Sequence, residues 1–436
     1  MGKKDILLTG LMLFALFFGA GNLIFPPFLG MEAGTSFWPA IIGFVITGVS
    51  LPVLAVIAVS LSKNGILSIG SRVHPVFGLI FAIVAYLAIG PFFGIPRGAS
   101  VAFEMGAAPF LADSSNKGTL FIFMAVFFIV VYILSLNPSK LVDRIGQWLT
   151  PILLLAVAVL CIVALAAFNA PLSAPTEKYA EAPFVTGFIE GYLTMDTIAA
   201  LAFGIVVMNT FASRGVRDQA SKVKFTIAAG LIAGVGLSVV YISIAWIGAK
   251  MELTEQFTNG GELLTAVSEA LFGEGGRALL GIIIGLACLT TCIGLTSATA
   301  QFFAEKWPAV SYKGFVAILT IISFLIANMG LTQIIAISVP ILTVIYPFAI
   351  ILVLLAFLHP FVQLSSRAIH IGAILMTALF SLNDGLAAIG WPDTWLHQAI
   401  SWVPFFSSGL GWVLPAVAGG IGGYIVSLLT RRTSVY

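Results

Sequence analysis

The sequence predicts an all-α protein that crosses a membrane twelve times. Of its 436 residues, 60% are hydrophobic and only 9% are charged, whereas soluble domains carry about a quarter charged residues. Apolar runs of the roughly 20 residues that span a bilayer recur along the whole chain. Segments rich in Lys and Arg also alternate with segments that are poor in them. These observations exclude a soluble domain with a single anchor.

Twelve apolar runs have the length expected of a membrane-spanning helix. The first continues without a small-residue cleavage site, so we interpret it as a span and not as a removed signal peptide. A polar loop is expected over 250–277, and the Trp-rich segment 391–409 is expected to hold a short interfacial helix. The predicted spans are 6–31, 38–62, 75–104, 118–137, 145–169, 184–212, 224–249, 278–304, 314–329, 332–358, 367–390 and 410–430.

Basic residues predict the orientation of these spans. With the N-terminus in the cytoplasm, 15 of the 20 Lys and Arg are cytoplasmic: Lys3, Lys4, Lys63, Arg72, Lys140, Arg144, Arg214, Arg217, Lys222, Lys224, Lys306, Lys313, Arg367, Arg431 and Arg432. The outer loops hold four others, and Arg97 lies in or near the membrane. Because cytoplasmic loops of membrane proteins carry excess positive charge, both termini are predicted to be cytoplasmic.

The first span is interrupted in its middle, at FALFFGAGNLIFPPFLG (residues 14–30). Pro26 and Pro27 have no N–H, so they leave the carbonyls of Asn22 and Leu23 without donors. A break of this kind presents free amides, which suit a carboxylate, and free carbonyls, which suit an ammonium group or a bare cation. The alternative for residues 19–22 is close helix packing through small residues.

A second interruption, FIEGYLTMDTIAALAFG (residues 188–204), lies in the sixth span. Spans one and six each open a block of five, and an odd number of spans inverts the second block relative to the first. Interrupted helices in matching positions of two inverted halves indicate a transport site near the bilayer midplane. We therefore expect a first repeat over 1–170, a second over 183–358, and two further helices in 359–436.

The eighth predicted span contains LACLTTCIGLTSATAQFF (residues 286–303), which places Ala287, Thr290 and Thr291 on one helical face. Two hydroxyls and a carbonyl are hard oxygen ligands that suit an alkali cation. The alternative is that the threonines bond to carbonyls of their own helix.

Charged residues inside predicted spans need partners or water. Arg97 and Glu104 share one helical face, so they form either a structural ion pair or an outer gate. Asp196 lies within the second interruption, which favours a functional role. The chain shows no nucleophile–base pair, phosphate loop or H-E-x-x-H motif, so an enzyme is not expected. Its three cysteines resemble packing residues, and its net charge of +2 gives no indication of nucleic-acid binding.

Four stretches of this chain resemble the branched-chain amino acid:cation symporters of bacteria: LFALFFGAGNLIFPPFLG, GPFFGIPRGASVAFE, GYLTMDTIAALAFGIV and LACLTTCIGLTSA. The resemblance implies a LeuT-type fold, with five-plus-five inverted repeats, broken helices one and six, and two C-terminal helices. It also implies sodium-coupled uptake of leucine, isoleucine and valine across the bacterial cytoplasmic membrane. No obligate protein partner is implied.

The resemblance to LeuT-type transporters assigns roles to single residues. The substrate carboxylate would bind the amides of Ala20 and Gly21 within Gly19–Asn22, and its ammonium group the carbonyls around Thr194–Asp196. Met195 and Phe203 would lie near its side chain. The carbonyls of Ala15, Phe18 and Ala287 and the hydroxyls of Thr290 and Thr291 would bind one Na⁺.

Departures from the family pattern leave alternatives open. Some LeuT-type transporters bind a second sodium ion through an asparagine early in their seventh helix, and this chain has none there. The outer gate pair of those transporters, an Arg in the first helix and an Asp in the tenth, is also missing, and Arg97 could substitute for it. Proton coupling through Asp196 or Glu104 is the main alternative. A channel is the second alternative, but it would need a continuous polar path that this chain does not offer.

Overall fold

The computed structural model describes residues 2–62, 65–111, 116–137, 142–251, 257, 259–358, 366–392 and 394–433. All regular structure in these ranges is helical, and nine helical segments there are long and apolar enough to cross a membrane. The all-α membrane architecture is therefore confirmed, whereas the count of twelve spans remains a prediction. Lys63, Lys140 and the predicted boundary at residue 359 lie outside the described residues, as do the side chains of Arg144, Arg431 and Arg432.

The described residues in the first half of the chain form nine α-helices. The predicted spans 38–62 and 75–104 each consist of two α-helices. They are separated by π-helical turns at Ile46–Ser50 and Ala88–Phe92, respectively. The helices are α1 (Lys3–Phe17), α2 (Ala20–Ala33), α3 (Phe37–Val45), α4 (Leu51–Ser60), α5 (Gly65–Ser71), α6 (Pro75–Leu87), α7 (Gly94–Val101), α8 (Lys117–Ser135) and α9 (Thr150–Ala167).

The second half forms eleven α-helices within the ranges that the structure describes. They are α10 (Glu177–Ala180), α11 (Pro183–Glu190), α12 (Asp196–Ser213), α13 (Gln219–Lys250), α14 (Gly260–Phe272), α15 (Glu274–Lys306), α16 (Tyr312–Ala327), α17 (Leu331–Leu358), α18 (Ser366–Ala388), α19 (Trp395–Ile400) and α20 (Val413–Thr433). The Trp-rich segment does contain a short helix, α19.

Helix α14 shows that the loop predicted over 250–277 was wrong in part. Asn259 caps this helix, since its side-chain oxygen accepts hydrogen bonds from the amides of Gly261 and Glu262. Leu263, Leu264 and Val267 form its buried face. These apolar residues recur at helical spacing among polar ones, so the helix packs on its neighbours without being apolar enough to suggest a span.

The third predicted span was expected to be continuous, but it bends between α6 and α7. Gly90 has non-helical dihedrals (φ −83°, ψ −119°) and Pro91 follows it, so the backbone turns there. A Cβ on Gly94 would lie 2.0 Å from the carbonyl oxygen of Ile89, which requires glycine at this close approach. The bend redirects α7, the helix that carries Arg97.

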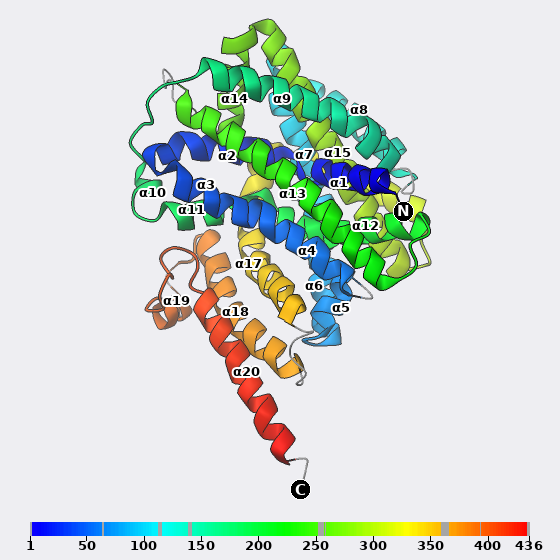
Figure 1. The fold of residues 1–436 in the computed structure, drawn as a ribbon, viewed down its shortest axis with the longest axis vertical. Helices are drawn as coiled ribbons and strands as arrows, with labels where there is room; N and C mark the ends of the chain where they lie inside the picture. The colour runs from blue at the N-terminus through cyan, green and yellow to red at the C-terminus, as the bar shows by residue number, and fades with distance from the viewer. Residues whose placement is uncertain are drawn as a thin grey trace.

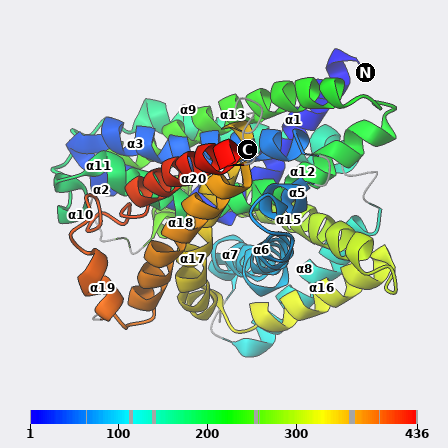
Figure 2. The same ribbon diagram turned by 90° about the horizontal axis from the view of Figure 1, so that it is seen from below.

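The helices pack so that α1 and α2 lie along α13, and α3 along α11 (Figure 1). Seen from below, α7 lies between α17 and α6 (Figure 2), and it also contacts α8. The last helices, α18 and α20, contact each other closely through glycines and occupy one end of the molecule, where α20 carries the C-terminus outward (Figure 1). The segments that contain the two predicted interruptions are largely buried among these helices.

Candidate functional site

The first hydrophobic segment is divided between α1 and α2 by a tight turn. Phe18 has φ −73° and ψ 79°, and the Gly19 amide donates to the carbonyl of Phe17 at 2.8 Å, as in an inverse γ-turn. A Cβ on Gly19 would lie 2.9 Å from Thr291 Oγ1, so α15 approaches this turn too closely for a larger residue. Pro26 and Pro27 lie inside α2, so the division precedes the prolines and lies beside Gly19–Asn22, the stretch that the resemblance marked as the break.

Asn22 connects this division to the second one. Its side-chain oxygen accepts from the Gly19 amide at 3.1 Å, and its Nδ2 donates to the Asp196 carboxylate and the Tyr241 hydroxyl. Asn22 is 1% exposed. Its oxygen therefore caps α2, and its Nδ2 joins the start of α2 to α12 and α13.

The second interruption lies between α11 and α12. A short 3₁₀ turn covers Gly191–Thr194, Met195 adopts the left-handed region (φ 70°, ψ 6°), and α12 begins at Asp196. Non-glycine residues at positive φ are uncommon and cluster at functional sites. The Thr197 amide donates to the Tyr346 hydroxyl at 3.2 Å, which satisfies one of the free amides at the start of α12.

The two interruptions face one small cavity of about 40 Å³, enough for one or two water molecules. The structure brings most of the predicted substrate residues to its wall: Gly19, Ala20, Gly21, Asn22, Thr194, Met195 and Asp196. Apolar residues that the sequence did not single out complete the wall, among them Ile89, Ala199 and Leu295. The wall therefore combines free backbone groups with an apolar surface.

Two predicted residues lie elsewhere. Phe203 is fully buried and packs edge-on against Phe17 with ring centroids 5.8 Å apart, but it is not part of the cavity wall. Glu104 accepts a hydrogen bond from the Leu331 amide at 3.3 Å. Among the described residues it forms no ion pair with Arg97. The structural pair considered for Arg97 and Glu104 is therefore not formed.

Arg97 points into the cavity. Its Nη2 donates to the Leu193 carbonyl at 3.0 Å and its Nη1 to Met195 Sδ at 3.2 Å. The guanidinium carbon lies 5.5 Å from the centre of the Phe25 ring. Arg97 is only 6% exposed, so it is a buried cation that contacts both interrupted segments.

Next to the cavity, oxygens of α1 and α15 converge. Thr290 Oγ1 lies 3.0 Å from the Ala15 carbonyl oxygen and also 2.9 and 3.0 Å from those of Leu286 and Ala287. Thr291 Oγ1 lies 3.1 Å from the Leu16 carbonyl oxygen and 3.4 Å from that of Ala15. Four of the five residues predicted to bind sodium therefore meet here, and Phe18 forms the adjacent turn. The oxygen-only donor set is suitable for an alkali cation.

Tyr241 was missed by the sequence analysis. It is fully buried in α13, and its hydroxyl lies 3.5 Å from Asp196 Oδ2. Its ring also stacks near that of Phe18. The sequence held one signal for it, a tyrosine within the otherwise mostly apolar span 224–249. A buried tyrosine hydroxyl usually has a hydrogen-bond partner, so this residue indicates a polar neighbour.

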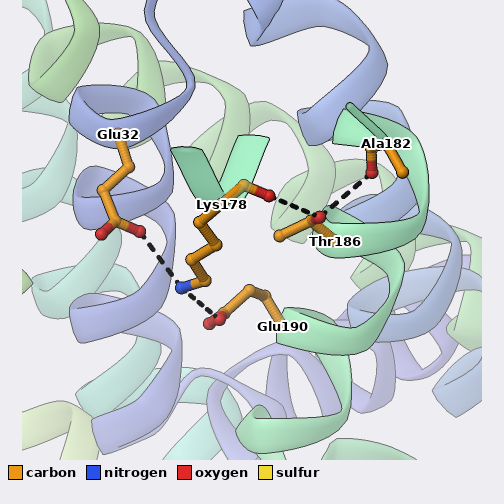
Figure 3. A network of polar contacts seen from close by, with 5 residues as sticks. All are labelled: Glu32, Lys178, Ala182, Thr186 and Glu190. Atoms are coloured by element: carbon orange, nitrogen blue, oxygen red, sulfur yellow. Dashed lines mark hydrogen bonds and ion pairs between the residues drawn. The ribbon is translucent and has the colours of Figure 1, made fainter. Parts of the chain in front are cut away.

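A second polar cluster, the outer network, ties the end of α2 to α10 and α11 (Figure 3). Lys178 Nζ lies 3.1 Å from Glu32 and 2.6 Å from Glu190. Burial lowers the pKa of Lys178, but the Glu190 and Glu32 carboxylates outweigh this effect and raise it above its ordinary value. Thr186 donates to the carbonyls of Lys178 and Ala182, which fixes α10 against α11 (Figure 3).

The sequence pattern of a known family matches residues 2–430, almost the whole chain, and that family is described as branched-chain amino acid transport protein. The chain belongs to the branched-chain amino acid transport protein family. It is 44% identical to the branched-chain amino acid permease BraB of Bacillus subtilis (98% of this chain, 96% of that one). It is 42% identical to the permease BrnQ of Escherichia coli strain K12 (95% and 94%).

Solved structures of other transporters have a similar fold. A closed conformation of Mhp1, a nucleobase-cation-symport-1 family transporter with bromovinylhydantoin bound, matches with a TM-score of 0.64 at 14% identity (98% of this chain, 93% of that one). MhsT in complex with L-phenylalanine matches with a TM-score of 0.53 at 17% identity (96% and 98%). The resemblance to a transporter family is therefore confirmed: the protein is a multi-pass transporter of the bacterial inner-membrane type, and not an enzyme.

Proposed function

We propose that the protein is a secondary active transporter that takes up leucine, isoleucine and valine together with sodium across the cytoplasmic membrane. The observation that carries the proposal is the cavity between two interrupted helical segments, whose wall holds free backbone groups and an apolar surface. A branched aliphatic amino acid needs both. The family membership and the names of the relatives support the substrate class.

In this proposal α1 with α2 and α11 with α12 are the two halves of broken spans one and six. The protein then has twelve spans, both termini in the cytoplasm, inverted repeats over 1–170 and 183–358, and two further helices in 359–436. The distribution of Lys and Arg supports this orientation. Rocking of one set of helices against the other would open the cavity to either side.

The substrate zwitterion would bind the backbone at both interruptions. Ala20 and Gly21 begin α2, where the first amides have no intrahelical acceptor and the helix dipole favours an anion. Carbonyls around Thr194–Asp196 would accept the ammonium group. Met195 and the apolar wall would contact the side chain, and Phe203 would support this wall from behind through Phe17.

One Na⁺ would bind between α1 and α15, at the carbonyls of Ala15, Phe18 and Ala287 and the hydroxyls of Thr290 and Thr291. The convergence of these oxygens across two helices supports the site. Because α1 ends beside it, a bound cation would stabilise the turn that positions α2 for substrate. Each charge moved inward gains about 2.3 kcal/mol per 100 mV of membrane potential.

The deciding experiment is uptake of labelled leucine into proteoliposomes with sodium or choline outside and no pH gradient. We expect accumulation above equilibrium only with sodium. Uptake that is equal in choline would refute sodium coupling. If this uptake then follows a pH gradient imposed in a second assay, proton coupling through Asp196 or Glu104 is favoured instead. A current without any substrate would indicate a channel.

A further inference from the structure

Arg97 has a position that the outer-gate hypothesis does not explain. The bend at Gly90–Pro91 turns α7 inward, so the guanidinium enters the central cavity. A cation in the membrane interior is costly unless water or a partner compensates for its lost hydration. With 6% of its surface exposed, Arg97 has little access to water.

Within the described residues this guanidinium forms no ion pair, although the Asp196 carboxylate is near enough to attract it electrostatically. Its hydrogen bonds go to the Leu193 carbonyl and to Met195 Sδ, and a thioether is a weak acceptor. The Asp196 carboxylate is bound by Asn22 and Tyr241, and no ion pair joins it to Arg97 within the described ranges. The arginine therefore keeps bidentate donors that no carboxylate of the described residues contacts directly.

The same guanidinium lies at the place where the anion would bind. Nη2 is 2.6 Å from the position that a Cβ on Gly21 would occupy. The Gly21 amide is among the first of α2, which attract negative charge. A carboxylate on this amide would thus lie directly against Arg97.

We propose that Arg97 is the specificity-determining residue that receives the α-carboxylate of the amino acid. This role rests on the proposed function and selects α-amino acids over amines and amides of the same shape. When Arg97 turns to the carboxylate, it leaves the Leu193 carbonyl free for the ammonium group of the same substrate. While it donates to Leu193, the arginine occupies the place of that ammonium group, and it also contacts Phe25 of α2.

The test is competition for bound labelled leucine on the purified full-length protein by leucine, leucinamide and 3-methylbutylamine. The second compound lacks the carboxylate charge, and the third lacks the whole carboxyl group. We expect wild-type protein to prefer leucine over leucinamide by about 100-fold, the size of a charge-assisted bidentate contact. Arg97→Gln should weaken leucine about 30-fold and leucinamide less than about threefold, and Arg97→Lys should restore part of the preference.

Arg277→Gln is the matched control, because Arg277 is an exposed arginine that pairs with Glu269 at 2.6 Å. It should leave every affinity unchanged. Equal weakening of leucine and leucinamide by Arg97→Gln would assign Arg97 a structural role and overturn the proposal. If Arg97→Gln does not fold, Arg97→Lys and the wild-type preference decide, and a wild-type preference below about threefold also overturns it. A folded wild-type protein that binds no leucine would instead refute the proposed function itself.

Discussion

Lys178 and Arg97 are both cations that connect the first interrupted segment to the second, yet their surroundings are opposite. Lys178 lies in the outer network with two carboxylates, and its side chain is 44% exposed. Arg97 is buried in the cavity beside a carbonyl, a thioether and an aromatic ring. The difference separates structure from function: a surface cation in ion pairs joins helices, whereas a buried cation that no carboxylate contacts directly is available to a ligand.

The largest effect should come from Asn22→Ala, which removes the link between both interruptions. The Asp196 carboxylate would lose a buried donor, so we expect a loss of about 3 kcal/mol in the free energy of unfolding and no leucine binding. Thermal unfolding and labelled-leucine binding measure the two effects. Asn209→Ala is the control, because it removes an exposed hydrogen bond between the side-chain amides of Asn209 and Gln301. Normal binding by the Asn22 variant would show that the two interruptions function independently.

Gly21→Ala should have the next largest effect. Its Cβ would lie 2.6 Å from Arg97 Nη2 and 3.1 Å from Thr194 Cα, so it crowds the cavity from the α2 side. We expect leucine affinity to fall at least about tenfold, as for an overpacked core. The control is Gly285→Ala in α15, where the new methyl group meets open space. Equal leucine affinities of the two variants would show that the start of α2 is not part of the binding site.

Replacing both Thr290 and Thr291 by Ala tests the sodium site beside the cavity. The sodium concentration for half-maximal uptake should rise about five- to tenfold, because two hydroxyl ligands are lost. Thr320→Ala removes a hydroxyl that bonds only within its own helix, to Val316, and should change nothing. If the double variant keeps the wild-type sodium dependence, the threonines only bond to carbonyls, as in the alternative considered from the sequence.

Lys178→Met in the outer network should have the smallest effect. The lysine is partly exposed, so we expect less than about 1 kcal/mol in the free energy of unfolding and unchanged leucine affinity. Because the pKa of Lys178 is raised, its contribution is complete below the ordinary lysine value and is lost only as pH rises through the raised one. Unfolding midpoints of wild type and variant should differ by the same amount at pH 7 and pH 9. A strong effect on transport would make the outer network part of the gating machinery.

Much of the site could be predicted because its signals are local. Glycines, prolines and an asparagine in an apolar run mark a division of the first segment, although the turn forms at Phe18, upstream of the prolines. The threonines of α15 lie on one helical face by their spacing alone. The loop predicted over 250–277 was wrong in part because the apolar face of α14 is too short to resemble a span.

The sequence by itself determined the membrane class and predicted the approximate spans, the two interruptions and the candidate oxygens, because hydropathy and backbone chemistry act over a few neighbouring residues. Only the tertiary structure decided which of these groups meet. Asn22 and Tyr241 are 219 residues apart along the chain, and Arg97 and Met195 are 98 apart. The bend at Gly90–Pro91 redirects α7 so that Arg97 enters the cavity, while Glu104 lies on the π-helical turn Ala102–Ala107 that follows α7. Contacts across such separations depend on how whole helices pack, which no local pattern records.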